Sequence, residues 1–164
     1  MFDIELIVQP YQTFKVPNMP IIKYPVYKED DNYLCIPKFY GLKKFGQPDE
    51  NHEFDGIKVN YLFKFKPRKT DVLDQNTVIN DTIKKIDEIG GGLICAGCGA
   101  GKTFMALYIA HHYKLKTLVI VHKTFLLNQW VEKIKEYTDG ECKVGIIQRD
   151  KIDVEDKDIV IGML

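Results

Sequence analysis

One short segment in the second half of the chain constrains the fold more than any other. Residues 96–104 read A-G-C-G-A-G-K-T-F, with three glycines before a lysine and a threonine. The apolar run at residues 92–95 is typical of a buried strand, and residues 102–113 carry apolar side chains at helical spacing. The pattern predicts a glycine loop (residues 96–101) between a strand and a helix.

Such a loop suits a nucleotide polyphosphate, because free N–H groups and the helix dipole at a helix N-terminus both favour negative charge. Glycine allows backbone conformations that other residues avoid and a close approach to the phosphates. We expect Lys102 and Thr103 to be the catalytic residues, with Lys102 on the β- and γ-phosphates and the Thr103 hydroxyl on Mg²⁺. The nucleotide contacts expected in this segment are Ala96, Gly97, Cys98, Gly99, Ala100, Gly101, Lys102, Thr103 and Phe104. A glycine-rich turn without a ligand is the alternative interpretation.

The length and net charge of the chain limit its number of domains and its partners only broadly. The chain has 164 residues, enough for one full domain or for one small domain and part of another. Its 23 basic and 23 acidic side chains cancel, so composition alone does not favour a nucleic-acid partner. We interpret the local basic run of Lys64, Lys66, Arg68 and Lys69 as a solvated face.

The compartment follows from what the sequence lacks. No apolar run is long enough to span a bilayer, and the acidic start has no basic signal region. Four scattered cysteines do not form a disulfide framework, and Cys95-x-x-Cys98 has no second pair to complete a zinc site. We expect four unpaired cysteines in an intracellular protein of the cytoplasm or nucleus, without a membrane partner.

Two regions follow different patterns. Residues 1–70 hold all seven prolines and predict a small β-rich or α+β accessory domain, with short strands in 4–8, 21–27, 33–36 and 59–65 and one helix in 37–45. Residues 71–164 alternate between helix and strand. The expected elements are a helix capped by Asn76, the strand 92–95, a helix to about Lys114, strand 118–121, helix 124–137 and strands 143–147 and 158–161. This alternation predicts an α/β fold, a parallel sheet with helices on both faces.

The residues around the loop resemble a known family. Ala96-x-x-Gly99-x-Gly101-Lys102-Thr103 resembles motif I of superfamily 2 helicases, which commonly begin with alanine where the general pattern has glycine. Residues 119–124 resemble motif Ia of the same family, and the pair Gln129-Trp130 that follows is typical of its XPB-like and restriction-type branches. With residues 158–164, they are similar to the transcript-release helicases of poxviruses and other large DNA viruses. The resemblance implies that residues 71–164 are part of a RecA-like ATPase domain.

The resemblance implies a motor that uses ATP and Mg²⁺ and moves on nucleic acid. DNA is the expected nucleic acid, and RNA is the alternative. Lys123 and Thr124 would contact the nucleic-acid backbone, and Gln75, 27 residues before Lys102, would recognise adenine. We interpret Trp130 as a core residue. Transcription machinery is a further candidate partner, and a viral protein of this kind would lie in a virion or viral factory.

After the glycine loop, no apolar strand is directly followed by the acidic pair that hydrolysis needs to complete the Mg²⁺ site. In the family, the Asp-Glu motif would follow residue 164. We therefore expect an N-terminal fragment of a longer helicase, able to bind nucleotide but not to hydrolyse it efficiently. Two alternatives stay open: another P-loop enzyme such as a small kinase, and a non-enzymatic docking module with a vestigial loop.

Overall fold

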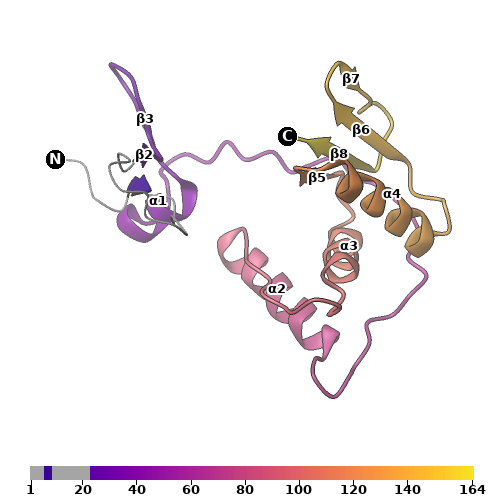
Figure 1. Ribbon diagram of the computed structural model, residues 1–164. Helices are drawn as coiled ribbons and strands as arrows, with labels where there is room; N and C mark the ends of the chain where they lie inside the picture. The colour runs from indigo at the N-terminus through magenta and orange to yellow at the C-terminus, as the bar shows by residue number, and fades with distance from the viewer. Residues whose placement is uncertain (1–5, 9–22) are drawn as a thin grey trace, which may run out of the picture. The chain divides into compact units, whose positions relative to one another are not determined.

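The computed structural model describes residues 6–8 and 23–164 of the chain (Figure 1). Its contacts divide the chain into two compact units, Met1–Glu53 and Phe54–Leu164. Residues 54–70, which composition grouped with the N-terminal region, make their contacts within the second unit. Parts of two expected strands, residues 4–5 and 21–22, lie outside the described residues.

The first unit is built from short elements. Strand β1 (Ile7–Val8) pairs with β2 (Tyr24–Pro25), β3 (Lys28–Glu29) pairs with β4 (Leu34–Cys35), and both pairs are antiparallel. Helix α1 (Lys38–Phe45) follows β4 within the segment where the sequence predicted a helix. The β3–β4 turn closes because the Asp30 carboxylate accepts hydrogen bonds from the N–H groups of Asn32 and Tyr33.

The second unit is an α/β fold, as predicted. Its elements are α2 (Gln75–Ile89), α3 (Lys102–Tyr113), β5 (Thr117–Val121), α4 (Thr124–Thr138), β6 (Val144–Gln148), β7 (Lys151–Ile152) and β8 (Ile159–Met163). The sheet order is β5-β8-β6-β7. Strands β5 and β6 run parallel to β8, and the short β7 pairs antiparallel to β6 at the edge. No helix among the described residues is long and apolar enough to cross a membrane.

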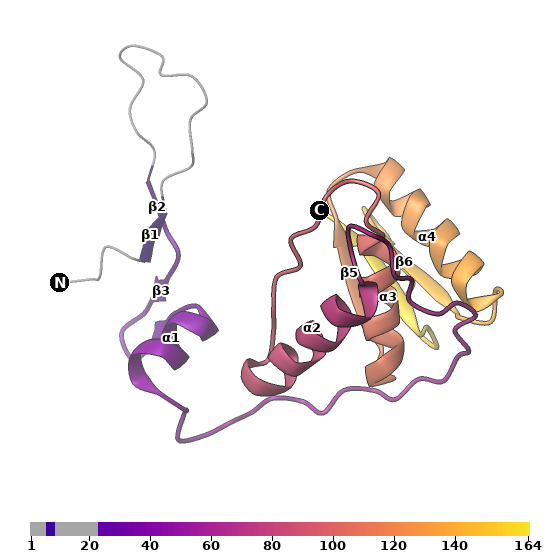
Figure 2. The same cartoon turned by 90° about the horizontal axis from the view of Figure 1, so that it is seen from below.

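Helices α3 and α4 lie against the sheet (Figures 1 and 2). Leu107 of α3 and Ile134 of α4 share one buried cluster with Val121, Ile159 and Ile161 of the strands. At β5 the expectation of helices on both faces is wrong, because its alternate side chains Leu118 and Ile120 are 56% and 59% exposed. Successive strand residues point to opposite faces, so only one face of β5 is covered.

Helix α2 begins one residue earlier than its expected cap. The capping side chain is Asp74 and not Asn76: the Asp74 backbone is extended, and its carboxylate accepts a hydrogen bond from the Asn76 N–H at 2.9 Å. A carboxylate at this position satisfies an N–H group that has no partner inside the helix. At the other end, Gly90 takes the left-handed conformation that closes the last turn.

The expected strand at residues 92–95 does not form. Leu93 is 88% exposed, and the segment belongs to neither a strand nor an isolated bridge. An apolar run becomes a strand only where a neighbouring strand takes its hydrogen bonds, and none of the described strands lies beside this one. The glycine loop therefore follows a segment that is not paired with any described strand.

Aromatic packing explains why residues 54–70 belong with the second unit. The Phe63 ring lies 5.6 Å from Phe104, 5.5 Å from Tyr108 and 5.8 Å from Tyr137, measured between ring centroids. The backbone N–H of Lys64 also donates to the Tyr137 carbonyl at 2.8 Å. Large rings dominate core energetics, so these contacts outweigh the compositional likeness of residues 54–70 to the N-terminal region.

A glycine in β6 is required by packing. A Cβ at Gly145 would lie 2.1 Å from the backbone oxygen of Asp153, whereas one at Gly162 of β8 would meet its nearest atom at 3.6 Å. We expect Gly145→Ala to lower the free energy of unfolding by about 1–3 kcal/mol, because the turn after β7 must move. Urea denaturation would measure this loss. The matched change Gly162→Ala should cost less, and equal losses would contradict the packing argument.

Candidate functional site

The glycine loop leads directly into α3. Gly101 takes a left-handed conformation with φ +84° and is the N-cap of the helix, and Gly99 has φ +77°. A Cβ at Gly97 or Gly99 would meet no atom within 4 Å, so there is open space beside both residues. Unpaired N–H groups at a helix start with room in front of them can receive an anion.

Lys102 reaches back over this loop. Its Nζ donates hydrogen bonds to the carbonyl oxygens of Ala96 and Gly97, both at 2.8 Å. The side chain is exposed, so it can exchange these carbonyls for a phosphate. Thr103 follows on the first turn of α3 and is half-buried. An ammonium, a hydroxyl and helix N–H groups form a donor set that fits a nucleotide polyphosphate with Mg²⁺.

Gln75 braces the glycine loop from the side. Only 5% of this residue is exposed. Its Oε1 accepts a hydrogen bond from the Arg68 N–H at 2.9 Å, and its Nε2 donates to the Ala100 carbonyl at 3.0 Å. A Cβ at Gly101 would lie 2.5 Å from the same Nε2. The carboxamide predicted to recognise adenine therefore already binds two backbone groups, one of them in the loop.

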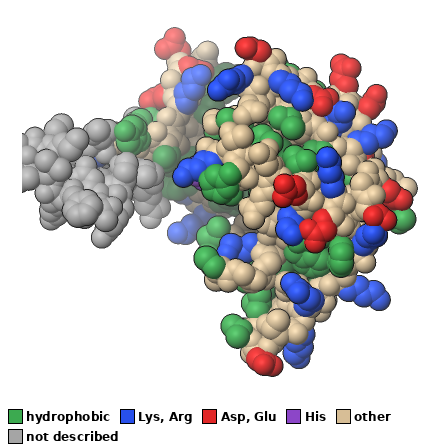
Figure 3. All heavy atoms as spheres, turned by 45° about the vertical axis from the view of Figure 1, so that its right-hand side comes forward, with side chains coloured by type: hydrophobic (Ala, Val, Ile, Leu, Met, Phe, Trp, Pro, Cys, Tyr) green, Lys and Arg blue, Asp and Glu red, His purple; other side chains and the backbone are tan. Residues whose placement is uncertain are grey.

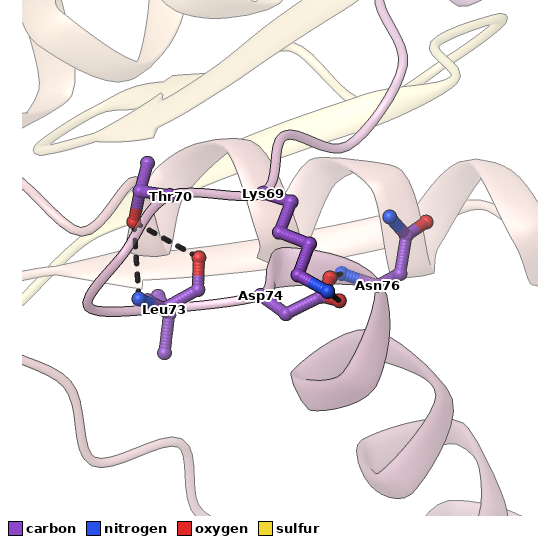
Figure 4. Close-up of polar contacts among 5 residues, drawn as sticks. All are labelled: Lys69, Thr70, Leu73, Asp74 and Asn76. Carbon is purple, nitrogen blue, oxygen red and sulfur yellow. Dashed lines mark hydrogen bonds and ion pairs between the residues drawn. The ribbon is translucent and has the colours of Figure 1, made fainter.

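Arg68, whose N–H binds the Gln75 Oε1, begins a tight hairpin of residues 68–75 (Figure 4). The Thr70 hydroxyl accepts from the Leu73 N–H and donates to the Leu73 carbonyl, both at 3.0 Å. Lys69 pairs with Asp74 at 4.0 Å, and the Gln75 N–H donates to the Arg68 carbonyl at 3.0 Å. These contacts hold the hairpin at the start of α2.

A cavity of about 490 Å³ lies between the hairpin and the loop. Its lining residues are Arg68, Thr70, Val72, Leu73, Gln75 and the loop residues Ala96, Gly97, Cys98, Gly99 and Ala100. The structure thus brings Gln75 together with five of the predicted loop contacts. Arg68, Thr70, Val72 and Leu73 were not among the predicted site residues. For Arg68 the reason is that the basic run around it suggests a solvated face. Their proximity to Gln75 in the sequence was the available signal.

The remaining predicted residues lie elsewhere. Phe104 is buried against Phe63 and Tyr137, so its ring anchors α3 in the core and does not line the cavity. Lys123 and Thr124 begin α4 at the carboxyl end of β5, where the Lys123 Nζ lies 6.0 Å from the exposed Phe125 ring. The Thr124 hydroxyl contacts the Met163 sulfur at 3.5 Å. Trp130 packs against the core, as expected.

This sheet, with a glycine loop entering a helix, defines a RecA-like ATPase core of the superfamily 2 type. A solved structure shares that fold: the Sulfolobus solfataricus SWI2/SNF2 ATPase core in complex with dsDNA matches 63% of this chain and 22% of its own, with TM-score 0.51 and 19% identity. Residues 68–164 match the family described as ResIII, the Type III restriction enzyme res subunit, and the chain belongs to this family.

Two curated relatives refine the relationship. "Putative ATP-dependent RNA helicase L396" of Acanthamoeba polyphaga mimivirus is 44% identical over 130 residues, which cover 77% of this chain and 24% of the relative. The "DNA 3'-5' translocase XPB2" of Sulfurisphaera tokodaii is 44% identical over 48 residues, 29% of this chain and 11% of the relative. The predicted XPB-like relationship is confirmed. The chain spans about a quarter or less of these relatives.

Proposed function

We propose that the second unit binds ATP with Mg²⁺ through the glycine loop and serves as part of a motor that acts on nucleic acid. The observation that carries the nucleotide proposal is the Lys102 ammonium, held by two loop carbonyls at 2.8 Å beside an open, glycine-lined helix start. Family membership supports the use of ATP.

Each residue has a defined part in this proposal. Lys102 leaves the carbonyls of Ala96 and Gly97 and contacts the β- and γ-phosphates, while the loop N–H groups hold the phosphate oxygens. Thr103 contributes a hydroxyl ligand to Mg²⁺, and the ion supplies positive charge that offsets the phosphates. Gln75 keeps the loop in place through Ala100. Because no acidic pair directly follows an apolar strand between the glycine loop and residue 164, we expect slow hydrolysis by these residues.

The nucleic-acid part of the proposal rests on the start of α4. Two relatives carry the words RNA helicase and DNA translocase in their names, and the structural neighbour was solved with dsDNA. In this chain Lys123 and Thr124 stand at a helix N-terminus, where N–H groups and a cation suit a phosphate backbone. On the face shown in Figure 3, basic and acidic side chains are interspersed, which favours a local contact over a broad positive surface. The same proposal includes the motor activity of the whole protein and an interaction with transcription machinery. It also includes a location in the cytoplasm, the nucleus or a viral factory.

Removing the Lys123 charge tests the nucleic-acid contact. We expect Lys123→Ala to reduce the slope of log affinity against log salt by about 1, because one phosphate contact is lost. Fluorescence anisotropy with labelled single-stranded DNA, duplex DNA and RNA measures this slope. Lys135→Ala, the same change at an exposed position on α4, is the control. Equal slopes for the Lys123→Ala variant and the unchanged protein would place the contact elsewhere.

A further inference from the structure

Two cysteines lie at the start of the glycine loop, and their thiols have no part in the nucleotide binding proposed above. Cys95 and Cys98 are three residues apart, and both are unpaired and exposed. Cys98 lines the cavity of about 490 Å³ beside the loop, and Cys95 lines a second cavity of about 340 Å³ beside α2. Small reagents in solution can therefore reach both thiols.

The other two cysteines are placed differently. Cys142 is 4% exposed and belongs to the buried cluster of the second unit, and Cys35 lies in β4 of the first unit. Among the described residues, no group of three or more histidine, cysteine or acidic side chains could hold a metal ion. An exposed C-x-x-C pair outside a metal site is typical of reversible thiol–disulfide exchange.

The backbone between the two cysteines holds the lysine of the loop. The Lys102 Nζ donates to the carbonyl oxygens of Ala96 and Gly97, both at 2.8 Å. These are the two residues that separate Cys95 from Cys98. A disulfide between the cysteines would enclose both carbonyls in one small ring, so the lysine and the pair of thiols depend on the same backbone.

Formation of the disulfide requires the loop to rearrange, because the two thiols line different cavities. The loop now turns at residues 97–100, where the Ala100 N–H donates to the Gly97 carbonyl at 3.4 Å. A disulfide holds its two Cα atoms within about 7 Å, which for residues three apart requires a tight turn. The turn would therefore move to residues 95–98.

The structure leaves room for this movement. A Cβ at Gly97 or Gly99 would meet no atom within 4 Å, and residues 92–95 pair with no described strand. Glycine also adopts backbone conformations that other residues avoid. The loop can thus change its turn without a clash at these glycines.

We propose that Cys95 and Cys98 form a reversible disulfide that prevents nucleotide binding. When the turn moves to residues 95–98, the loop N–H groups leave the arrangement that receives the phosphates, and Lys102 loses the two carbonyls that hold it. This inference rests on the proposed function and adds a means of regulating it.

The oxidant is a low-molecular-weight disulfide such as glutathione disulfide. The Cys98 thiolate attacks one sulfur of that disulfide, its sulfur–sulfur bond breaks, and one glutathione thiolate leaves and takes up a proton. The Cys95 thiolate then attacks the Cys98 sulfur and releases the second glutathione in the same way. In total the two cysteines lose two protons and two electrons, and one glutathione disulfide becomes two thiols. Excess reduced glutathione reverses both steps.

Mass spectrometry and titration calorimetry of residues 1–164 test the inference. The protein carries Cys35→Ser, which removes the exposed thiol of the first unit. In glutathione buffers of increasing oxidised fraction, we expect the loss of two hydrogen atoms and a dissociation constant for MgATP at least about tenfold higher. Dithiothreitol should restore the original affinity. Saturating MgATP should shift the exchange equilibrium towards the two thiols, because coupling between two binding equilibria is reciprocal.

Cys95→Ser in the same background is the matched control, since it keeps the Cys98 thiol and removes its partner. Reduced glutathione is kept in excess, so that a single cysteine without an intramolecular partner stays a thiol. The control should bind MgATP with the same affinity in every buffer. Circular dichroism checks that both proteins are folded.

The outcomes separate this inference from the proposed function. A Cys95–Cys98 disulfide that leaves MgATP affinity within about threefold would overturn the inference and leave the proposed function standing. Failure of this disulfide to form, its formation between two chains, or an equal loss of affinity in the Cys95→Ser control would also overturn the inference alone. If the fully reduced protein does not bind MgATP, both fail.

Discussion

Lys102→Ala is expected to raise the dissociation constant for MgATP by about 10- to 100-fold. The ammonium supplies charge-assisted hydrogen bonds, each of which contributes about 1.5–3 kcal/mol. Fold stability should change by less than about 0.5 kcal/mol, because the side chain is exposed. Titration calorimetry and urea denaturation of the same preparations separate the two effects.

Lys135→Ala is the control for this result, since it removes one positive charge from an exposed site on α4. It should leave nucleotide affinity unchanged. A Lys102→Ala variant that binds MgATP as tightly as the control would show that the glycine loop does not hold the phosphates. The proposal of a nucleotide-binding unit would then fail.

The second large effect is expected at Gly101. Its φ of +84° is costly for any residue with a Cβ, and that Cβ would lie 2.5 Å from the Gln75 Nε2. Left-handed strain costs about 1–2 kcal/mol. Displacing Gln75 leaves buried hydrogen-bonding groups unpaired at about 1–3 kcal/mol. We expect Gly101→Ala to lower the free energy of unfolding by about 2–5 kcal/mol and to abolish nucleotide binding.

Two other loop glycines provide a graded control series. Gly99→Ala introduces left-handed strain but no clash, because nothing lies within 4 Å of its Cβ. Gly97→Ala introduces no clash, and Gly97 has no positive φ. The expected order of destabilisation, measured by urea denaturation, is Gly101 above Gly99 above Gly97. If Gly101→Ala lowers the free energy of unfolding no more than Gly99→Ala does, the contact between Gln75 and the loop does not stabilise the fold.

Local patterns predicted most of the regular elements in the second unit. The helices α3 and α4 and the strands β5, β6 and β8 lie within about two residues of their expected bounds, since apolar spacing and glycine positions act over a few neighbouring residues. The predicted strand 92–95 did not form, because its formation depends on more than the local pattern. Its apolar residues satisfied the pattern, but a strand also needs a hydrogen-bonded neighbour, which no local pattern provides.

Long-range packing decided the grouping of residues 54–70. Their composition resembles the N-terminal region, yet Phe63 packs on Phe104 and Tyr108 of α3 and on Tyr137 of α4. The same contacts place the Phe104 ring in the core. The cap of α2 is a smaller case: Asp74 takes this position and not Asn76, because the choice between two nearby polar residues depends on backbone conformation.

The sequence alone was enough to specify a glycine loop at a helix start, with Lys102 and Thr103 in place for a phosphate, because that chemistry depends on adjacent residues. Only the tertiary structure could bring the 68–75 hairpin against this loop, join Gln75 to Ala100 and place Arg68 beside the cavity. Gln75 and Ala100 are 25 residues apart, and their contact depends on how α2 packs on α3. The loop and the helix start are thus encoded locally, whereas the cavity beside the loop arises from the fold.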